Sequence, residues 1–310
     1  MNKTITVVTP CFNEEDNILV LYTKVKNEFK KIPEYNYKHL FIDNSSIDNS
    51  KKILRELAKN DLNVQVIFNT RNFGAIRSPY YGLLQGKGDA LIFMVCDLQD
   101  PPELIQTFIK CWENGDKVVI GVKNRTEEVG VMSYIRLFYY KLIDKISEIK
   151  LIKNFTGYGL YDRSIIDELL KIDSPYPYFR GLISEIGFSV REIPYYQPLR
   201  KNGISKYSIY NLYQVAMLGI TSHSLVPLRV ATFVGFFISI LCLIISLGYL
   251  FLKILYWDRF PLGIATLLVA LFFFASVQIF FIGILGEYIA TILLQVKKRP
   301  LVFEEERINF

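Results

Sequence analysis

The sequence is poor in cysteine, and the four cysteines lack the close spacing that marks a metal or redox site. They are Cys11, Cys96, Cys111 and Cys242 in a chain of 310 residues, and no Cys-x-x-Cys pair occurs. Zinc and redox sites use such pairs, and disulfide frameworks need more cysteines in a shorter chain. We therefore expect reduced, buried thiols with no metal or disulfide role.

A secretory signal and a nucleic-acid-binding segment are also missing. Residues 1–10 read as a short strand, with no basic region and no small-residue cleavage site. The net charge is +6, and no block of Lys and Arg is interleaved with aromatic residues. We therefore expect no nucleic-acid partner, a cytoplasmic location for the part before the first apolar run, and a basic excess at a membrane surface.

Charge is absent from two long segments near the C-terminus. No Asp, Glu, Lys or Arg occurs between Val230 and Leu252, or between Pro261 and Gly286. A helix rises about 1.5 Å per residue, so roughly 20 residues cross a hydrocarbon core of about 30 Å. Buried helices of a soluble protein are the alternative, but these rarely run so long without a charge. The pattern predicts a two-helix transmembrane hairpin.

The predicted organisation has five parts. They are a cytoplasmic catalytic domain at 1–206, an amphipathic juxtamembrane helix at 207–228, transmembrane helices at 229–253 and 261–287, and a cytoplasmic tail at 288–310. An ordinary core helix is the alternative for 207–228. Arg229 and the run Lys297-Lys298-Arg299 flank the spans on the catalytic side. This agrees with the positive-inside rule and predicts a multi-pass protein of the inner or plasma membrane.

The first part of the chain alternates between short β-branched runs and helical patterns, which predicts a mostly parallel sheet with helices on both faces. Strands are expected at 4–10, 39–43, 63–68, 90–95 and 117–121, and helices at 18–31, 50–59, 74–86 and 103–113. Two later stretches are expected to be irregular: a Gly-rich polar turn at 154–163 and a substrate-contacting flap at 175–206.

Polar loops follow the carboxyl ends of these strands, where open α/β sheets bind ligands. They carry Asn13, Glu14, Glu15, Asp43, Asn44, Asp97, Gln99 and Asp100. Acidic loops from several strands of one sheet edge could together hold a divalent cation and a phosphate-bearing ligand.

Several short motifs occur in a telling order and spacing. They are Val8-Thr9-Pro10-Cys11-Phe12-Asn13-Glu14-Glu15, Asp43-Asn44-Ser45-Ser46-Ile47-Asp48, Arg71-Asn72-Phe73-Gly74, Asp97-Leu98-Gln99-Asp100-Pro101-Pro102-Glu103, Arg180-Gly181-Leu182, Arg200-x-x-Gly203-x-Ser205-Lys206, and Gly286-Glu287-Tyr288 with Arg299-Pro300. On these the chain resembles family 2 glycosyltransferases of the GT-A fold. It looks most like the polyisoprenyl-phosphate glycosyltransferases of the bactoprenol glucosyltransferase and dolichol-phosphate mannose synthase type. The resemblance covers the whole chain, including the hairpin.

The resemblance implies an inverting, metal-dependent membrane hexosyltransferase. It would move a sugar from a nucleotide-diphosphate donor to a polyisoprenyl (undecaprenyl) phosphate for cell-envelope glycan modification. The expected donor is a UDP-sugar. Analogy alone suggests a homotetramer. A processive polysaccharide synthase is disfavoured, because its Gln-x-x-Arg-Trp element is absent. A catalytically weakened sugar-nucleotide-binding scaffold protein remains the alternative.

The resemblance also assigns roles to residues. The donor-binding residues would be Pro10, Phe12, Asn13, Glu14, Glu15, Asp43, Asn44, Asn72, Gly74, Lys123 and Arg136. Asp97 and Gln99 would hold Mg²⁺ or Mn²⁺. The lipid phosphate would bind Arg180, Arg200 and Lys206, since arginine suits bidentate phosphate contacts. Helix capping is the alternative for Asp97, and attraction to anionic headgroups is the alternative for Arg200 and Lys206.

The chain departs from the family pattern at three places. Val95 stands where the family has the leading Asp of Asp-x-Asp, and Asn44 replaces the second Asp of the nucleotide element. The stretch 154–162 lacks the Asp that relatives carry near Gly157 and that is usually proposed as a base. A phosphate monoester is mostly a dianion at pH 7, so it needs little deprotonation. Our hypothesis is that Glu185 supplies the missing carboxylate and orients the acceptor.

Overall fold

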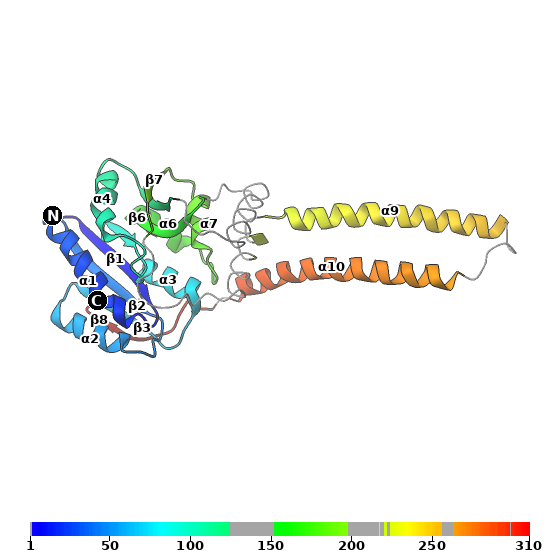
Figure 1. The fold of residues 1–310 in the computed structure, drawn as a ribbon. Helices are drawn as coiled ribbons and strands as arrows, with labels where there is room; N and C mark the ends of the chain where they lie inside the picture. Colours follow the sequence, from blue (N-terminus) through cyan, green and yellow to red (C-terminus); the bar gives the residue numbers. More distant parts are fainter. Residues whose placement is uncertain are drawn as a thin grey trace.

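The computed structural model describes residues 2–124, 152–197, 217, 220–221, 224–255, 263–297 and 299–310. In chain order the elements are β1 (Thr4–Cys11), α1 (Glu15–Lys30), β2 (Asn36–Asp43), α2 (Ser50–Asn60), β3 (Val64–Asn69), α3 (Gly74–Gln85), β4 (Ala90–Phe93), the 3-10 turn η1 (Pro102–Leu104), α4 (Ile105–Glu113), β5 (Val118–Lys123), β6 (Phe155–Asp162), α6 (Arg163–Lys171), α7 (Phe179–Glu185), β7 (Val190–Tyr195), α9 (Val226–Leu255), α10 (Ile264–Val296) and β8 (Glu304–Ile308). Figure 1 shows an α/β domain from which α9 and α10 extend together.

The described strands form one eight-stranded sheet in the order β7-β5-β6-β4-β1-β2-β3-β8. Strand β1 pairs in parallel with both β2 and β4, β2 pairs in parallel with β3, and β5 pairs in parallel with β7. Only β6 and β8 run against their neighbours. The predicted mostly parallel sheet is therefore confirmed, and the carboxyl ends of six strands lie along one edge.

Two apolar layers cover the sheet. Neighbouring residues of β1 point to opposite faces, so that Val7 belongs to one buried cluster and Val8 to the other. Helices α1, α2 and α4 pack on the Val7 face, and α3, α6 and α7 pack on the Val8 face. Burial on both sides explains why the central strands read as continuous apolar runs.

Two predictions of irregular structure are wrong. The stretch expected to be a polar turn forms β6, which lies between β4 and β5 and buries Phe155, Tyr158 and Tyr161. Its glycines fit close packing rather than a turn, because a Cβ on Gly159 would lie 2.5 Å from the carbonyl oxygen of Val119. The described part of the expected flap forms helix α7 and edge strand β7.

Helices α9 and α10 pack beside each other and point away from the sheet (Figure 1). Within the described residues, the segment Phe273–Val296 is long and apolar enough to cross a membrane, and Val226–Ile238 is a shorter apolar stretch. Large apolar side chains of both helices are exposed, which in water would be unfavourable. The predicted spans 229–253 and 261–287 overlap the two helices, but α10 continues to Val296.

The chain returns to the sheet after α10. Strand β8 pairs antiparallel with β3, with Val66 opposite Ile308 and Phe68 opposite Glu306. The sequence analysis predicted only a cytoplasmic tail at 288–310, and β8 corrects this. The run of three glutamates in β8 lacks the alternation of a typical strand. The predicted helix at 207–228 lies mostly outside the described residues.

Candidate active site

The predicted donor loops meet at the carboxyl edge of the sheet. Pro10 is the penultimate residue of β1, and Phe12 follows that strand directly. The next loop begins at Asp43, the last residue of β2. The backbone N–H of Asn13 donates to Oγ of Ser46 at 2.8 Å, and Oδ1 of Asn13 accepts from the N–H of Ile47 at 2.8 Å. Asn13 has a φ of 53°, a left-handed conformation that Asn tolerates. The first two loops therefore form one interlocked surface.

The two glutamates of the first loop contribute to the same interlock. The N–H of Glu14 donates to Oγ of Ser50 at 2.9 Å. Oε2 of Glu15 accepts from both the backbone N–H and the side-chain amide of Asn49, at 2.9 and 2.8 Å. Glu15 is thereby engaged in shaping the loop, and it also lies in the first turn of α1, where negative charge is favourable.

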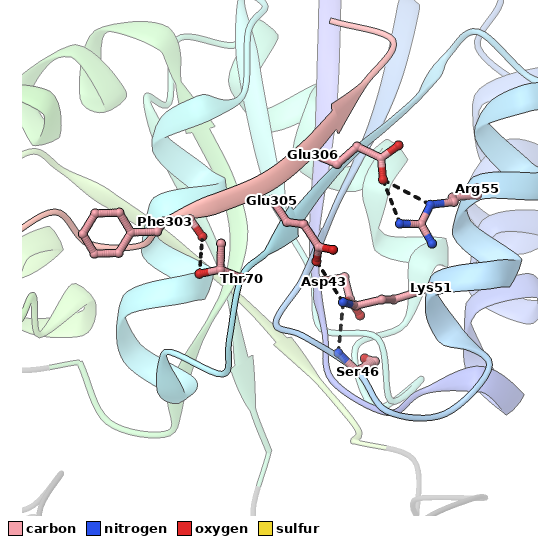
Figure 2. A network of polar contacts seen from close by, with 8 residues as sticks. All are labelled: Asp43, Ser46, Lys51, Arg55, Thr70, Phe303, Glu305 and Glu306. Atoms are coloured by element: carbon pink, nitrogen blue, oxygen red, sulfur yellow. Dashed lines mark hydrogen bonds and ion pairs between the residues drawn. The ribbon is translucent and has the colours of Figure 1, made fainter.

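Asp43 has one carboxylate oxygen without a partner. Its Oδ2 accepts from the N–H of Ser46 at 3.0 Å, whereas Oδ1 is buried and has no hydrogen-bond partner among the described residues. Burial raises the pKa of Asp43, while hydrogen bonds from Ser46 and the nearby charge of Lys51 oppose that shift. Figure 2 shows Lys51 reaching Glu305 of β8, to which its Nζ lies at 3.1 Å. An unpaired buried acceptor of this kind is suited to an N–H group of a ligand.

Asn44 is fully used as a structural amide. Its Oδ1 accepts from the N–H of Phe73 at 2.9 Å and from Nδ2 of Asn69 at 3.2 Å. Its Nδ2 donates to Oδ1 of Asn72 at 2.9 Å and to the carbonyl oxygen of Gly74 at 3.3 Å. A backbone N–H can only donate and a carbonyl can only accept, so these partners determine the amide orientation. An aspartate could not make the two donations.

The amide of Asn44 thus holds the loop between β3 and α3. Oδ1 of Asn72 also accepts from the N–H of Gly74 at 2.7 Å, and Gly74 has a φ of 87° that favours glycine. The predicted site residues Asn44, Asn72 and Gly74 therefore lie together, in a single hydrogen-bonded turn. The departure from Asp at position 44 has a structural explanation.

The loop after β4 carries the predicted metal ligands. Asp97 and Gln99 are both half-buried, and Oδ1 of Asp97 accepts from the N–H of Gln99 at 3.2 Å. Leu98 between them has a φ of 62°, which folds the loop sharply. Oδ1 of Asp97 is therefore engaged by a hydrogen bond within its own loop. Asp97 does not cap α4, because that helix begins at Ile105.

Asp100 and Tyr195 form a buried support beneath this loop. Oδ2 of Asp100 accepts from the N–H of Val95 at 3.1 Å, and Oδ1 accepts from the Tyr195 hydroxyl at 3.0 Å. Burial raises the pKa of Asp100 to about 6, while the hydrogen bonds and the charge of Lys123 act in the opposite direction. The sequence-based site omitted Tyr195, because nothing in its local pattern places β7 beside β5. Lys123, the last residue of β5, lies within electrostatic reach of Asp100.

The predicted acceptor residues are only partly described. Arg180, near the start of α7, donates to the carbonyl oxygen of Phe155 at 3.2 Å and lies 5.5 Å from the Tyr178 ring. It borders a pocket of about 120 Å³ whose other walls include Ile76, Tyr80 and Phe93. Arg200, Lys206 and Arg136 lie outside the described residues.

Glu185 is the exposed last residue of α7. It lies five positions after Arg180 in the helix, which corresponds to about 7.5 Å of rise and roughly 140° of rotation. The two side chains therefore leave α7 on different faces. Among the described residues, Glu185 forms no hydrogen bond or ion pair with another predicted catalytic residue.

The chain matches known glycosyltransferases along most of its length. The family model for glycosyl transferase family 2 matches residues 6–170. A putative glycosyltransferase, CsbB of Bacillus subtilis (strain 168), is 35% identical over 296 residues, which cover 96% of this chain and 89% of that protein. The bactoprenol glucosyl transferase of Shigella phage SfII is 33% identical over 297 residues, covering 96% of each chain.

The likeness extends to a solved structure. Glucosyl-3-phosphoglycerate synthase from Mycobacterium tuberculosis, in complex with phosphoglyceric acid, superposes with a TM-score of 0.50 at 16% identity. The match covers 71% of this chain and 78% of that structure. At this identity the comparison concerns the fold alone, and the fold is of the GT-A type.

Proposed function

The chain belongs to glycosyl transferase family 2, and from this membership we propose that it transfers a hexose from a nucleotide-diphosphate donor to a polyisoprenyl phosphate. The observation that carries the proposal is a contact between the donor side of the domain and the segment that follows the apolar helix α10. The donor loops lie at the carboxyl edge of the sheet, and at this edge Arg77, in the first turn of α3, donates to the carbonyl oxygen of Pro300, just beyond α10. A soluble donor and a lipid acceptor can meet only where such a site adjoins a membrane. The names of the bactoprenol glucosyl transferases support this acceptor class.

We assign the donor's base to the interlocked loops after β1 and β2. The free Oδ1 of Asp43 is buried and can accept one N–H. Uracil carries such an N–H, as do the other nucleobases, so this acceptor suits a nucleotide donor, of which we propose a UDP-sugar. Asn13, Glu14 and Glu15 then shape the wall of this site through their contacts with residues 46–50.

We propose that Asp97 and Gln99 hold Mg²⁺ or Mn²⁺. Both side chains offer the oxygen ligands that hard cations prefer. Among the residues that the structure describes, no group of three or more His, Cys, Asp or Glu could hold a metal by itself, and both oxygens of Asp100 already accept hydrogen bonds. Mg²⁺ often binds one or two protein ligands together with waters and substrate phosphates. A bound cation would neutralise the charge that grows on the departing diphosphate.

We assign the acceptor phosphate to the Arg180 side of the site, with Arg200 and Lys206 as further candidates from the sequence. The apolar pocket beside Arg180 supports a ligand that combines an anionic head with an apolar chain. The attacking phosphate oxygen is mostly ionised at pH 7. A single displacement by this oxygen would invert the sugar carbon, as the family does.

We propose that the chain crosses the membrane twice. Strand β8 follows α10 and pairs with β3, which precedes α9. Both ends of the hairpin therefore lie on the same side, and an even number of crossings is required if α10 spans the bilayer. The exposed apolar side chains of α9 support its role as the second span.

The proposal is tested with membranes that contain the full chain, radiolabelled UDP-sugars, undecaprenyl phosphate and Mg²⁺. We expect label in the organic extract with at least one donor, and at least about a 100-fold loss of transfer in Asp97→Asn. The control Asp167→Asn, on the exposed side of α6, should keep full transfer. No extractable label with any donor would favour the scaffold alternative.

A further inference from the structure

Three arginines from distant parts of the sequence gather where α10 leaves the apolar segment. Arg71 precedes α3, Arg77 lies in its first turn, and Arg299 follows the last residue of α10 by three positions. The guanidinium carbons of Arg71 and Arg77 lie 4.1 and 5.4 Å from the centre of the same Phe73 ring. Arg77 donates to the carbonyl oxygen of Pro300, which brings the residue after Arg299 into direct contact with α3.

Among the residues that the structure describes, the arginine cluster (Arg71, Arg77 and Arg299) lacks a carboxylate partner. Within the described residues, none of the three forms an ion pair with Asp or Glu, although nine other pairs are formed. Burial lowers the pKa of Arg77, and the positive charges of Arg71 and Arg299 add to this effect. The Nε of Arg77 is buried and has no acceptor among the described residues. Mutual repulsion without a counter-charge is offset most directly by a bound anion.

We infer that the arginine cluster binds the phosphate of an anionic phospholipid headgroup of the surrounding bilayer. Guanidinium groups suit phosphate oxygens because their planar N–H forks can donate two parallel hydrogen bonds. The cluster begins three residues beyond Val296, where the apolar segment ends, and therefore lies at the level expected for headgroups. The inference rests on membrane association of α10 and not on glycosyl transfer.

Position in the sheet separates the cluster from the reaction site. Arg71 follows β3, whereas Asp97 follows β4, and β2 and β1 lie between these strands. Three strand spacings of about 4.8 Å amount to roughly 14 Å. A phosphate held at Arg71 is therefore out of line with the proposed metal site beside Asp97. The pocket assigned to the acceptor shares α3 with the cluster, so the assay must compare the acceptor lipid with a bilayer lipid.

The predicted consequence is that a bound lipid ties the catalytic domain to the membrane. A headgroup bound to Arg71 and Arg77 is also linked to the loop that Asn44 holds. The link is the hydrogen bond that Arg71 Nη1 donates to the carbonyl oxygen of Asn72 at 3.1 Å. The cluster would then keep the donor loops at a constant height above the bilayer surface.

The test is lipid binding by the detergent-extracted full chain, measured by native mass spectrometry during titration with phosphatidylglycerol or phosphatidylcholine. We expect the wild type to prefer phosphatidylglycerol, and the variant Arg71→Gln/Arg77→Gln/Arg299→Gln to bind it roughly 100-fold more weakly, since each basic residue near a membrane surface contributes about a factor of five. The double variant Arg71→Gln/Arg299→Gln keeps the contact between Arg77 and Pro300, and should lose roughly 25-fold.

A charge-matched control is available at the opposite edge of the domain. The triple variant Lys30→Gln/Lys59→Gln/Lys110→Gln removes the same charge from exposed side chains in the last turns of α1, α2 and α4, and should bind phosphatidylglycerol like the wild type. Equal loss in both triple variants, or undiminished binding in the arginine variants, would overturn the inference. A parallel titration uses undecaprenyl phosphate, and tighter binding of this lipid than of phosphatidylglycerol that is lost in the arginine triple variant would also overturn the inference. The assay contains no nucleotide donor, so failure of the transfer reaction would leave its result unaffected.

Discussion

The side-chain nitrogen of Asn44 donates a hydrogen bond to Oδ1 of Asn72 at 2.9 Å and so joins the loop after β2 to the loop after β3. The other three partners of Asn44 belong to the same region, and the side chain is buried. The amide both donates and accepts, which the aspartate expected here from the resemblance could not do. This arrangement leads to the first prediction.

Asn44→Asp should destabilise the catalytic domain, although it introduces the aspartate that the resemblance leads us to expect here. The new carboxylate would face Oδ1 of Asn72 and the carbonyl oxygen of Gly74, so two donated hydrogen bonds are replaced by repulsion. We expect a loss of about 2–4 kcal/mol in the free energy of unfolding. Thermal unfolding measures it, with Asn27→Asp on the exposed face of α1 as the control. Equal melting temperatures for the two variants would contradict the structural role of Asn44.

Asp43→Asn should weaken donor binding. The N–H of Ser46 requires an oxygen at the Oδ2 position, so the amide nitrogen would take the place of the free Oδ1. A ligand N–H would then face a second donor. We expect the affinity for UDP to fall by about 10- to 100-fold, as for an unsatisfied polar pair. Isothermal titration calorimetry with the full chain and Mg²⁺ measures this. Unchanged affinity would place the base elsewhere.

Glu185→Gln tests the hypothesis that this carboxylate orients the acceptor. We expect turnover at saturating undecaprenyl phosphate to fall by about 10-fold or more, because general-base and orienting groups contribute at least this much in most enzymes. The matched control is Glu192→Gln, an exposed residue of β7. Full turnover in Glu185→Gln would end the hypothesis and leave the ionised phosphate to react without a protein carboxylate.

His39 should make the domain sensitive to mild acid. Its Nε2 lies 3.0 Å from Oγ1 of Thr9, its ring stacks on Phe41 at 3.9 Å, and burial lowers its pKa to about 3. The unfolded chain gains a proton near pH 6.5 that the folded chain does not accept. Stability therefore decreases as the pH falls below 6.5, by up to about 1.4 kcal/mol per pH unit until the folded pKa is reached.

His39→Gln removes this titration and should flatten the dependence. Melting temperatures of both proteins at several values between about pH 5 and pH 7 provide the comparison. The melting temperature of the wild type should fall more on acidification than that of the variant. Parallel curves would mean that His39 is not the group responsible.

Asn309 should control how firmly β8 is attached to the sheet. Its Nδ2 donates to the carbonyl oxygens of Ala58 and Val64 at 2.7 and 2.8 Å, and its φ is 61°. Asn309→Gly removes the hydrogen bonds, but glycine tolerates the positive φ. Asn309→Ala removes the hydrogen bonds and also strains the backbone, so it should lower the free energy of unfolding by about 1 kcal/mol more. Hydrogen exchange of β3 amides should accelerate most in Asn309→Ala. The same rate in both variants would show that the conformation of the backbone is unimportant here.

Much of the fold and part of the site could be predicted from the sequence. The strands from β1 to β5 and their helices follow from apolar periodicity, and the polar loops follow because parallel strands end at one edge. The positions of Asp43 and Asp97 at that edge are confirmed, while their roles remain predictions. The stretch that forms β6 was misread, because its glycines resemble a turn until Val119 is known to lie against Gly159.

The sequence alone determined the local elements and the two charge-free segments, since both depend on neighbouring residues and on the length of a run. Only the tertiary structure decided which distant groups meet. Three contacts illustrate this: β8 pairs with β3, Tyr195 donates a hydrogen bond to Asp100, and Arg71 and Arg77 lie near Arg299. Each joins residues that are tens to hundreds of positions apart in the sequence. No local pattern records such partners, because the free energy of each contact is realised only after both segments have been brought together.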